Sequence, residues 1–202
     1  MPVCKLQSFN FIFLFYGAFI AIFGYIFLRK NSKYMSLLTE QSLRRNGTVK
    51  SRYFIIPTLT FLHNFKEVSV ALTHRRKSTP PYTRVCATLN LVNDCDIIVA
   101  KETISYKIGK AFGYGEIKIG DDAFDGDFFI RSKNEIVVRN ILTDKVKAAL
   151  DNIKDLKPAL KIAKNKFSFV VPCSPKDTYQ LDQIIDTGLL ILSQLKDASY
   201  IM

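Results

Sequence analysis

The feature that most constrains this chain is an uncharged stretch of 23 residues from Leu6 to Leu28, whose part from Phe11 to Leu28 is apolar on every face. A helix of about 20 residues rises roughly 30 Å, which matches the hydrocarbon core of a bilayer. A signal peptide is the main alternative, but its apolar region spans about 7–15 residues and ends in a small-residue cleavage site. This run is longer and ends in Phe27-Leu28-Arg29-Lys30. We therefore predict one transmembrane helix at residues 9–28.

Basic residues flank the predicted span unevenly. Lys5 and the α-amino group precede it, and five basic residues against the single acid Glu40 follow it: Arg29, Lys30, Lys33, Arg44 and Arg45. The flank with more Lys and Arg normally stays in the cytoplasm. We therefore expect a short N-terminal tail outside and the domain that follows the span in the cytoplasm.

The chain divides into four parts on this reading: a tail at 1–8, the span at 9–28, a juxtamembrane linker at 29–47 and a soluble domain at 48–202. A domain of that length can bury a substantial core. The four cysteines are Cys4, Cys86, Cys95 and Cys173, and their spacing matches neither a zinc knuckle nor a dense disulfide framework. Free thiols in a reducing compartment are the preferred interpretation.

The net charge of +11 is unevenly distributed. Residues 1–110 hold 16 Lys and Arg against 5 acids, whereas residues 111–202 hold 13 of each. Basic residues near an anionic leaflet contribute about 1 kcal/mol each. The distribution favours contact with anionic lipids, and it makes nucleic acid the less favoured partner because the predicted anchor already explains a basic excess beside the membrane.

Short runs of alternating or β-branched residues predict an antiparallel meander in the first part of the domain. These runs are 48–56, 67–74, 82–91, 96–100, 104–108, 116–119, 127–131 and, later in the chain, 167–171. The final third has helical patterns instead. The predicted fold class is α+β: an N-terminal transmembrane helix, then an antiparallel sheet domain covered by C-terminal helices.

Three helix starts support the C-terminal part of this prediction. Ser132-Lys-Asn-Glu135 has the spacing of a capping box, and Thr143 can cap a second helix. Ser174-Pro-Lys-Asp177 opens a last helix with Pro175 at its first position. The apolar stripe of that helix consists of Leu181, Ile184, Ile185, Gly188, Ile191, Leu192 and Leu195.

The densest group of acids is Asp121, Asp122, Asp125 and Asp127. A calcium loop starting at Asp121 would need an oxygen ligand at its third position and a glutamate at its twelfth. Those positions hold Ala123 and Ser132, so the motif fails. The preferred interpretation is a turn between two strands, with the carboxylates bonded to nearby amides and with Phe124 and Phe128 in the core. Another ligand or metal site stays open as an alternative.

No linear catalytic motif emerges, and no cofactor is predicted. The glycines of Gly109-Lys110-Ala-Phe-Gly113-Tyr-Gly115 lack the spacing of a phosphate loop. A Cys173 thiol at a helix start could have a lowered pKa. A cysteine nucleophile also needs a base, and His63 and His74 show no pairing pattern with it.

Arg75-Arg76-Lys77 is the densest basic cluster, in a loop next to Pro80 and Pro81. Most such runs are simply solvated. The cluster could also contact lipid headgroups or an acidic partner.

The segments Lys110-Ala-Phe-Gly113, Ile119 to Asp125, Phe128 to Arg131 and Ile141-Leu-Thr143 carry a resemblance. They resemble a family of bacterial membrane-anchored proteins of unknown function, in which a GDxxFDxxFxVxS…LLT phrase follows a β-rich region. The resemblance implies an α+β domain in a bacterial envelope, and hence the inner membrane. It implies no reaction.

The leading functional hypothesis is a non-enzymatic interaction module at the membrane surface that presents its domain to a protein partner or to the leaflet. One alternative is an enzyme whose site has no linear signature, with Asp121, Asp122, Asp125 and Cys173 as its candidate groups. The other is a lipid- or nucleic-acid-binding domain that acts through its basic half.

Overall fold

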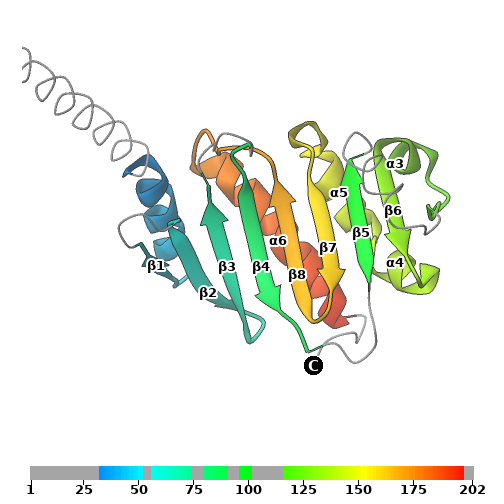
Figure 1. Ribbon diagram of the computed structural model, residues 1–202, viewed down its shortest axis with the longest axis horizontal. Helices are drawn as coiled ribbons and strands as arrows, with labels where there is room; N and C mark the ends of the chain where they lie inside the picture. Colours follow the sequence, from blue (N-terminus) through cyan, green and yellow to red (C-terminus); the bar gives the residue numbers. More distant parts are fainter. Residues whose placement is uncertain (1–31, 52–55, 74–79, 91–95, 102–115, 198–202) are drawn as a thin grey trace, which may run out of the picture.

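The computed structural model describes residues 32–51, 56–73, 80–90, 96–101 and 116–197 of this chain. Its centre is a single sheet with the strand order β1-β2-β3-β4-β8-β7-β5-β6 (Figure 1). All neighbouring strands are antiparallel. The strands are β1 (Thr48–Lys50), β2 (Thr58–His63), β3 (Lys66–Leu72), β4 (Thr83–Thr88), β5 (Ile97–Lys101), β6 (Phe128–Ser132), β7 (Ala159–Ala163) and β8 (Lys166–Val171).

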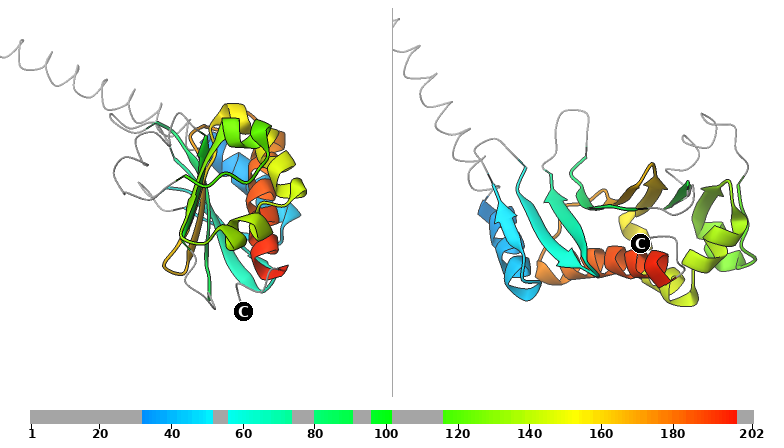
Figure 2. Two further views of the ribbon diagram at one scale, coloured as in Figure 1. Left: turned by 90° about the vertical axis from the view of Figure 1, so that its right-hand side faces the viewer. Right: turned by 90° about the horizontal axis from the view of Figure 1, so that it is seen from below.

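The described helices are a helix over residues 32–44, α3 (Asp122–Asp127), α4 (Glu135–Ile141), α5 (Asp144–Asp151), the short η1 (Lys154–Leu156) and α6 (Thr178–Asp197). The helix over residues 32–44, α5 and α6 lie on one side of the sheet (Figure 2). No described helix covers the opposite face, which is therefore called the open face.

Side-chain alternation along the strands produces this two-layer arrangement. In β3, Val68, Val70 and Leu72 are buried beneath α6, whereas Ser69 and Ala71 point to the open face. Because side chains alternate along a strand, one apolar set on each strand builds a continuous core. The open face receives the other set, which consists mostly of small and polar residues.

Two tight turns fix the register of neighbouring strands. Asn64 and Phe65 join β2 to β3, and Lys164 and Asn165 join β7 to β8, all four with positive φ. Two-residue hairpin loops with positive φ at both positions match the twist of the strands, and Asn tolerates this conformation well.

The helix α6 closes the core with the stripe predicted from the sequence. Its Leu181, Ile184, Ile191 and Leu195 are buried completely or almost completely. Each fully buried Leu or Ile contributes about 1.5–3 kcal/mol relative to an exposed one. Gly188 lets the helix approach the sheet closely, because a Cβ at this position would lie 3.3 Å from side-chain atoms of Val85 and Phe169.

The helix over residues 32–44 belongs to the same core. Its Tyr34, Leu37 and Leu38 are buried, and the Tyr34 hydroxyl forms a hydrogen bond with Ser174 Oγ. Ion pairs join its end to α6. Asp182 accepts from Arg44 Nη1 at 2.6 Å and from Arg45 Nη2 at 2.9 Å, and Arg45 also contacts Asp186.

The fold class predicted from the sequence is therefore wrong. None of the helices in the described ranges is long and apolar enough to cross a membrane, and the predicted span at 9–28 lies outside those ranges. Helical cover is not confined to the C-terminal part, because residues 32–44 pack on the sheet as well. The corrected fold is one eight-stranded antiparallel sheet with helices on one face.

The strand order is the second correction. A meander would pair β4 with β5, but β8 pairs with β4 and β7 pairs with β5, so the β7–β8 hairpin lies between them. Two of these strands, β2 and β7, are missing from the sequence prediction. Both begin just after a proline, Pro57 and Pro158.

Candidate functional site

The open face carries a row of side chains that crosses five strands. The register places these residues opposite one another from β6 to β4: Arg131, Ile98, Lys161, Ser168 and Cys86. Side chains that are directly opposite on antiparallel strands lie on the same face and within contact range. The row therefore gathers groups from distant parts of the sequence.

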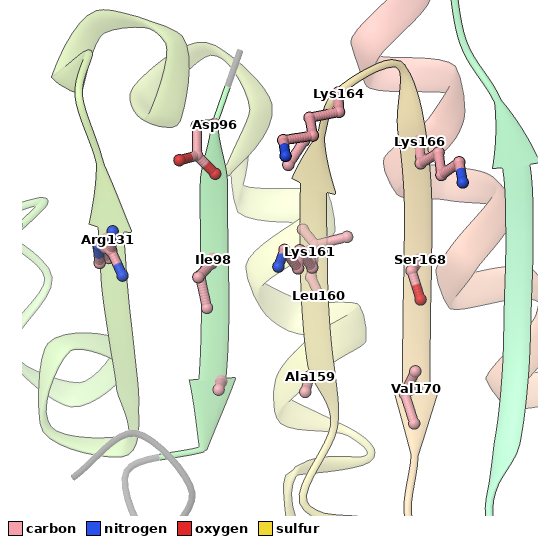
Figure 3. A pocket seen from close by; sticks show the side chains of 12 residues that line it. Asp96, Ile98, Arg131, Ala159, Leu160, Lys161, Lys164, Lys166, Ser168 and Val170 are labelled. Atoms are coloured by element: carbon pink, nitrogen blue, oxygen red, sulfur yellow. The ribbon is translucent and has the colours of Figure 1, made fainter. Parts of the chain in front are cut away.

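A hollow of about 820 Å³ lies along this row over β6, β5, β7 and β8 (Figure 3). It is called the basic hollow below. Among the described residues, its charged lining consists of Arg131, Lys161, Lys164 and Lys166 against one acid, Asp96. Its volume is in the range of small-molecule sites, about 300–1,000 Å³.

The lining changes character along the strands. Asp96, Lys164 and Lys166 lie at one end of the basic hollow in Figure 3, and Ala159 and Val170 lie at the other. The hollow is thus charged at one end and apolar at the other.

A second hollow of about 450 Å³ adjoins the first over β3, β4 and β8, and it shares Lys166 and Ser168 with it. Its lining includes Cys86, whose half-buried thiol lies 3.8 Å from Ser168 Oγ. In the part of the chain that the structure describes, five basic and two acidic side chains line the two hollows: Arg84, Arg131, Lys161, Lys164, Lys166, Glu67 and Asp96. The open face is therefore an electropositive surface with a small-residue floor.

Local structure positions these basic groups. Lys164 stands in the tight β7–β8 turn, and Lys166 begins β8 just after that turn. Arg131, on β6, lines the hollow but is only 6% exposed. Arg84 lies over the Tyr82 ring, 4.8 Å from its centroid, which holds its side chain against the sheet.

The acidic cluster predicted as a turn forms the short helix α3 instead. Asp121 is its N-cap, and its carboxylate accepts a hydrogen bond from Phe124 N. Asp125 accepts hydrogen bonds from the amides of Ile119 and Gly120. The prediction that these carboxylates bond nearby amides is confirmed for both residues.

The predicted core role of the two aromatic residues is also confirmed, because Phe124 and Phe128 are buried and stack with ring centroids 4.5 Å apart. Asp122 is exposed. The structure therefore does not bring Asp121, Asp122 and Asp125 together as reacting groups.

Lysines neutralise the acids in the hollow of about 350 Å³ between α3 and α5. Lys147 Nζ contacts Asp121 at 2.8 Å and Asp144 at 2.9 Å. Asp127 contacts Lys154 at 3.1 Å and also pairs with Lys101. Across the described ranges, no cluster of three or more His, Cys, Asp or Glu side chains is arranged to hold a metal ion.

These contacts predict a specific response to acid. The hydrogen bond from Lys147, and then that from Phe124 N, lower the pKa of Asp121 from its ordinary 3.8. Such a group stabilises the fold above its ordinary pKa, and this stabilisation is lost as the pH falls through the lowered value. Asp121→Asn should therefore lower the melting temperature at pH 7, and the difference from the parent should shrink as the pH falls below 3.8.

Asparagine can still cap the helix, so this variant isolates the charge. Asp122→Asn is the matched control, because its exposed side chain lies one position away. Melting curves over this pH range, recorded by circular dichroism, provide the measurement. An Asp121→Asn difference that stays constant at every pH would contradict the assignment.

Cys173 lies away from this cluster, after the end of β8 and five residues before α6 begins. Burial raises the pKa of its thiol, which is the opposite of what an activated nucleophile needs. His63 shares hydrogen bonds with Ser193 and Asn64. The enzyme alternative therefore loses the grouping on which it depended.

Several other predicted features lie outside the described residues. These are the basic cluster Arg75, Arg76 and Lys77, the glycines of residues 109–115, His74 and two cysteines, Cys4 and Cys95.

The residues of the basic hollow were missed by the sequence analysis. Residues 111–202 are neutral as a whole, and this balance concealed the lysines of β7 and β8. The signal that could have found them is the alternation of Lys161 between Leu160 and Ile162, and of Lys166 and Ser168 with Phe167 and Phe169. Such alternation indicates half-buried strands with a polar outer face.

Comparison with known proteins yields one informative match of fold. No protein-family model matches the chain, and no curated protein matches it. The crystal structure of the mycobacterial trehalose monomycolate transport factor A is similar, with a TM-score of 0.51 at 9% sequence identity. The match covers 82% of this chain and 94% of that chain. At this identity the likeness is one of fold, and the resemblance to the bacterial membrane-anchored family stays a prediction.

Proposed function

We propose that this protein is a non-enzymatic binding module that uses the open face of its sheet to bind anionic lipids. The single observation that carries the proposal is the basic hollow. Of the residues that the structure describes, four basic side chains and one acidic side chain surround a floor of small apolar residues there. Its likeness of fold to a transport factor for trehalose monomycolate is compatible with a binding role.

The chemistry of the open face favours a lipid over an enzyme substrate. The described groups that would have to react already have structural roles or a raised pKa: Asp121 and Asp125 accept hydrogen bonds from nearby amides, and burial raises the pKa of the Cys173 thiol. The lysines at the hollow are exposed, so they can reach an anionic headgroup without losing a partner from the core. The proposed location, on the cytoplasmic side of a bacterial inner membrane, stays a prediction.

Neutralising two lysines of the hollow tests this proposal. Each basic residue close to an anionic surface contributes about 1 kcal/mol, so Lys161→Gln with Lys166→Gln should weaken vesicle binding about 30-fold. The full chain is mixed with vesicles of phosphatidylcholine that also contain phosphatidylglycerol, and bound protein is measured by flotation. Vesicles of phosphatidylcholine alone measure the binding that does not depend on charge, which includes any contribution of residues 9–28 and should be the same for both proteins.

Lys145→Gln is the matched control, because Lys145 is an exposed lysine of α5 on the helical side of the sheet. Equal binding of the parent and the double variant would overturn the proposal. So would a loss of binding on neutralising Arg75, Arg76 and Lys77 that leaves the Lys161 and Lys166 variant unaffected, because the site would then be the predicted basic loop.

A further inference from the structure

We infer that the basic hollow holds one single-chain anionic amphiphile lengthwise, with its headgroup beside Lys164 and Lys166 and its chain over Ala159 and Val170. The inference rests on the proposed function and deepens it. The proposed function is binding to anionic lipids, whereas the inference is that the hollow binds one lipid molecule of defined chemistry.

The charge gradient of the hollow sets the orientation. Lys166 lies opposite Ala163 in the sheet register, and Lys164 occupies the adjoining turn. Two residues before Ala163 on β7, Lys161 lies opposite Ile98 of β5, and Ile98 lies opposite Arg131 of β6. A phosphate or carboxylate at this end would therefore meet the exposed ammonium groups of Lys161, Lys164 and Lys166, which come from β7, β8 and the turn between them.

Asp96 lies at the same charged end of the hollow (Figure 3). A carboxylate beside an anionic headgroup is favourable when the headgroup also carries a hydrogen-bond donor, such as the hydroxyl of a glycerol. An anionic headgroup with free hydroxyls can therefore interact favourably both with the lysines and with Asp96.

The opposite end is built to receive hydrocarbon. Ala100, Ala159 and Val170 lie opposite one another across β5, β7 and β8. Their side chains are short, whereas Lys161 stands two residues away on β7. Ala159 and Val170 are half-buried, so an acyl chain lying over them would bury more apolar surface, whereas Ala100 is already fully buried.

The dimensions of the basic hollow favour a ligand with one acyl chain. From Ala163 to Ala159 the strand covers four residue steps, about 14 Å at about 3.4 Å per residue. The volume of about 820 Å³ accommodates a headgroup and part of one chain. An amphiphile with one acyl chain is the class that combines these features.

The experiment compares three probes by isothermal titration calorimetry on the full chain. Lysophosphatidylglycerol supplies the anion, the hydroxyls and one chain, and it is kept below its micelle concentration. Lysophosphatidylcholine keeps a single chain without net charge, and glycerol 3-phosphate keeps the head without the chain. Lysophosphatidylglycerol should bind saturably with one site, and each of the other probes should bind about tenfold or more weakly.

Two variants separate the ends of the hollow. Lys161→Gln should weaken lysophosphatidylglycerol about fivefold and leave lysophosphatidylcholine unchanged. Ala159→Leu fills the apolar end and should weaken lysophosphatidylglycerol about tenfold, while glycerol 3-phosphate binding stays the same. Ala159→Ser keeps the small volume and is the control for this position.

Alkylation of Cys86 gives an independent readout of occupancy. The thiol lies in the adjoining hollow that shares Lys166 and Ser168, so bound lysophosphatidylglycerol should slow its alkylation. Cys173, beyond the end of β8, should react at an unchanged rate when each peptide is followed by mass spectrometry.

The outcomes distinguish the inference from the proposed function. Glycerol 3-phosphate that binds as tightly as lysophosphatidylglycerol, with both weakened by Lys161→Gln, would overturn the inference and support an anion site. Vesicle binding that depends on Lys161 and Lys166, without one-site binding of monomeric lysophosphatidylglycerol, would also overturn the inference and would leave the proposed function standing. Lysophosphatidylglycerol binding that neither Lys161→Gln nor Ala159→Leu changes would overturn both.

Discussion

Truncating Leu38 to alanine is expected to lower the free energy of unfolding by about 2–5 kcal/mol. Leu38 is 0% exposed, in the helix over residues 32–44 that packs on the sheet. Removing its side chain leaves a cavity between that helix and the core. Chemical denaturation followed by circular dichroism gives the midpoint and slope from which the change is calculated.

Leu43→Ala is the matched control, because Leu43 lies in the same helix and is 77% exposed. This change should stay within about 0.5 kcal/mol of the parent. If Leu38→Ala changed the free energy of unfolding as little as Leu43→Ala, residues 32–44 would not unfold cooperatively with the sheet. The ion pairs of Arg44 and Arg45 with Asp182 would then be surface contacts of little consequence.

Replacing Gly188 by leucine should be the second large effect. A Cβ alone would lie 3.3 Å from side-chain atoms of both Val85 and Phe169, so a larger side chain must push α6 away from the sheet. Overpacking of this kind costs about 1–3 kcal/mol. Thermal melting monitored by circular dichroism measures the loss.

Gly126→Leu tests whether the loss at Gly188 comes from packing rather than from a change in glycine content. A Cβ at Gly126 meets nothing within 4 Å, and leucine is the better helix former, so this variant should be neutral or slightly stabilising. Equal melting temperatures for Gly188→Leu and the parent would mean that α6 does not sit against β4 and β8 as described.

The elements that could be predicted from the sequence are those whose signal is local. In β3 and β4 the buried residues alternate with outward ones, and in α6 they recur at helical spacing. The pattern arises because one face of each element is buried, so a short window contains the information. The capping box was less accurate, since Asn134 rather than Ser132 caps α4.

The pairing of strands could not be read in the same way. The contact of β4 with β8 joins segments that are far apart in the chain, and no short window records it. The strand β7 has only Leu160 and Ile162 as buried residues and follows Pro158 directly. A proline is compatible with the start of a strand, so it did not exclude one there.

The basic hollow depends on that same long-range register. Each of Lys161, Lys164 and Lys166 looks like an ordinary solvated lysine in the sequence. Only the placement of the β7–β8 hairpin between β4 and β5 brings them beside Arg131. Local composition favoured the first 110 residues as the charged surface, whereas four of the five described basic residues that line the two hollows come from residues 131–166.

The position of the β7–β8 hairpin also has a consequence for synthesis on the ribosome. Chains emerge N-terminus first, so β1 to β4 can pair before β8, which begins at Lys166, has been made. During that interval β4 has an unpaired edge, and Val85 lacks the cover that α6 later provides. Unpaired edges are templates for pairing with other chains. The nascent protein should therefore be most prone to aggregation, and most dependent on chaperones, in the interval before its last third leaves the exit tunnel.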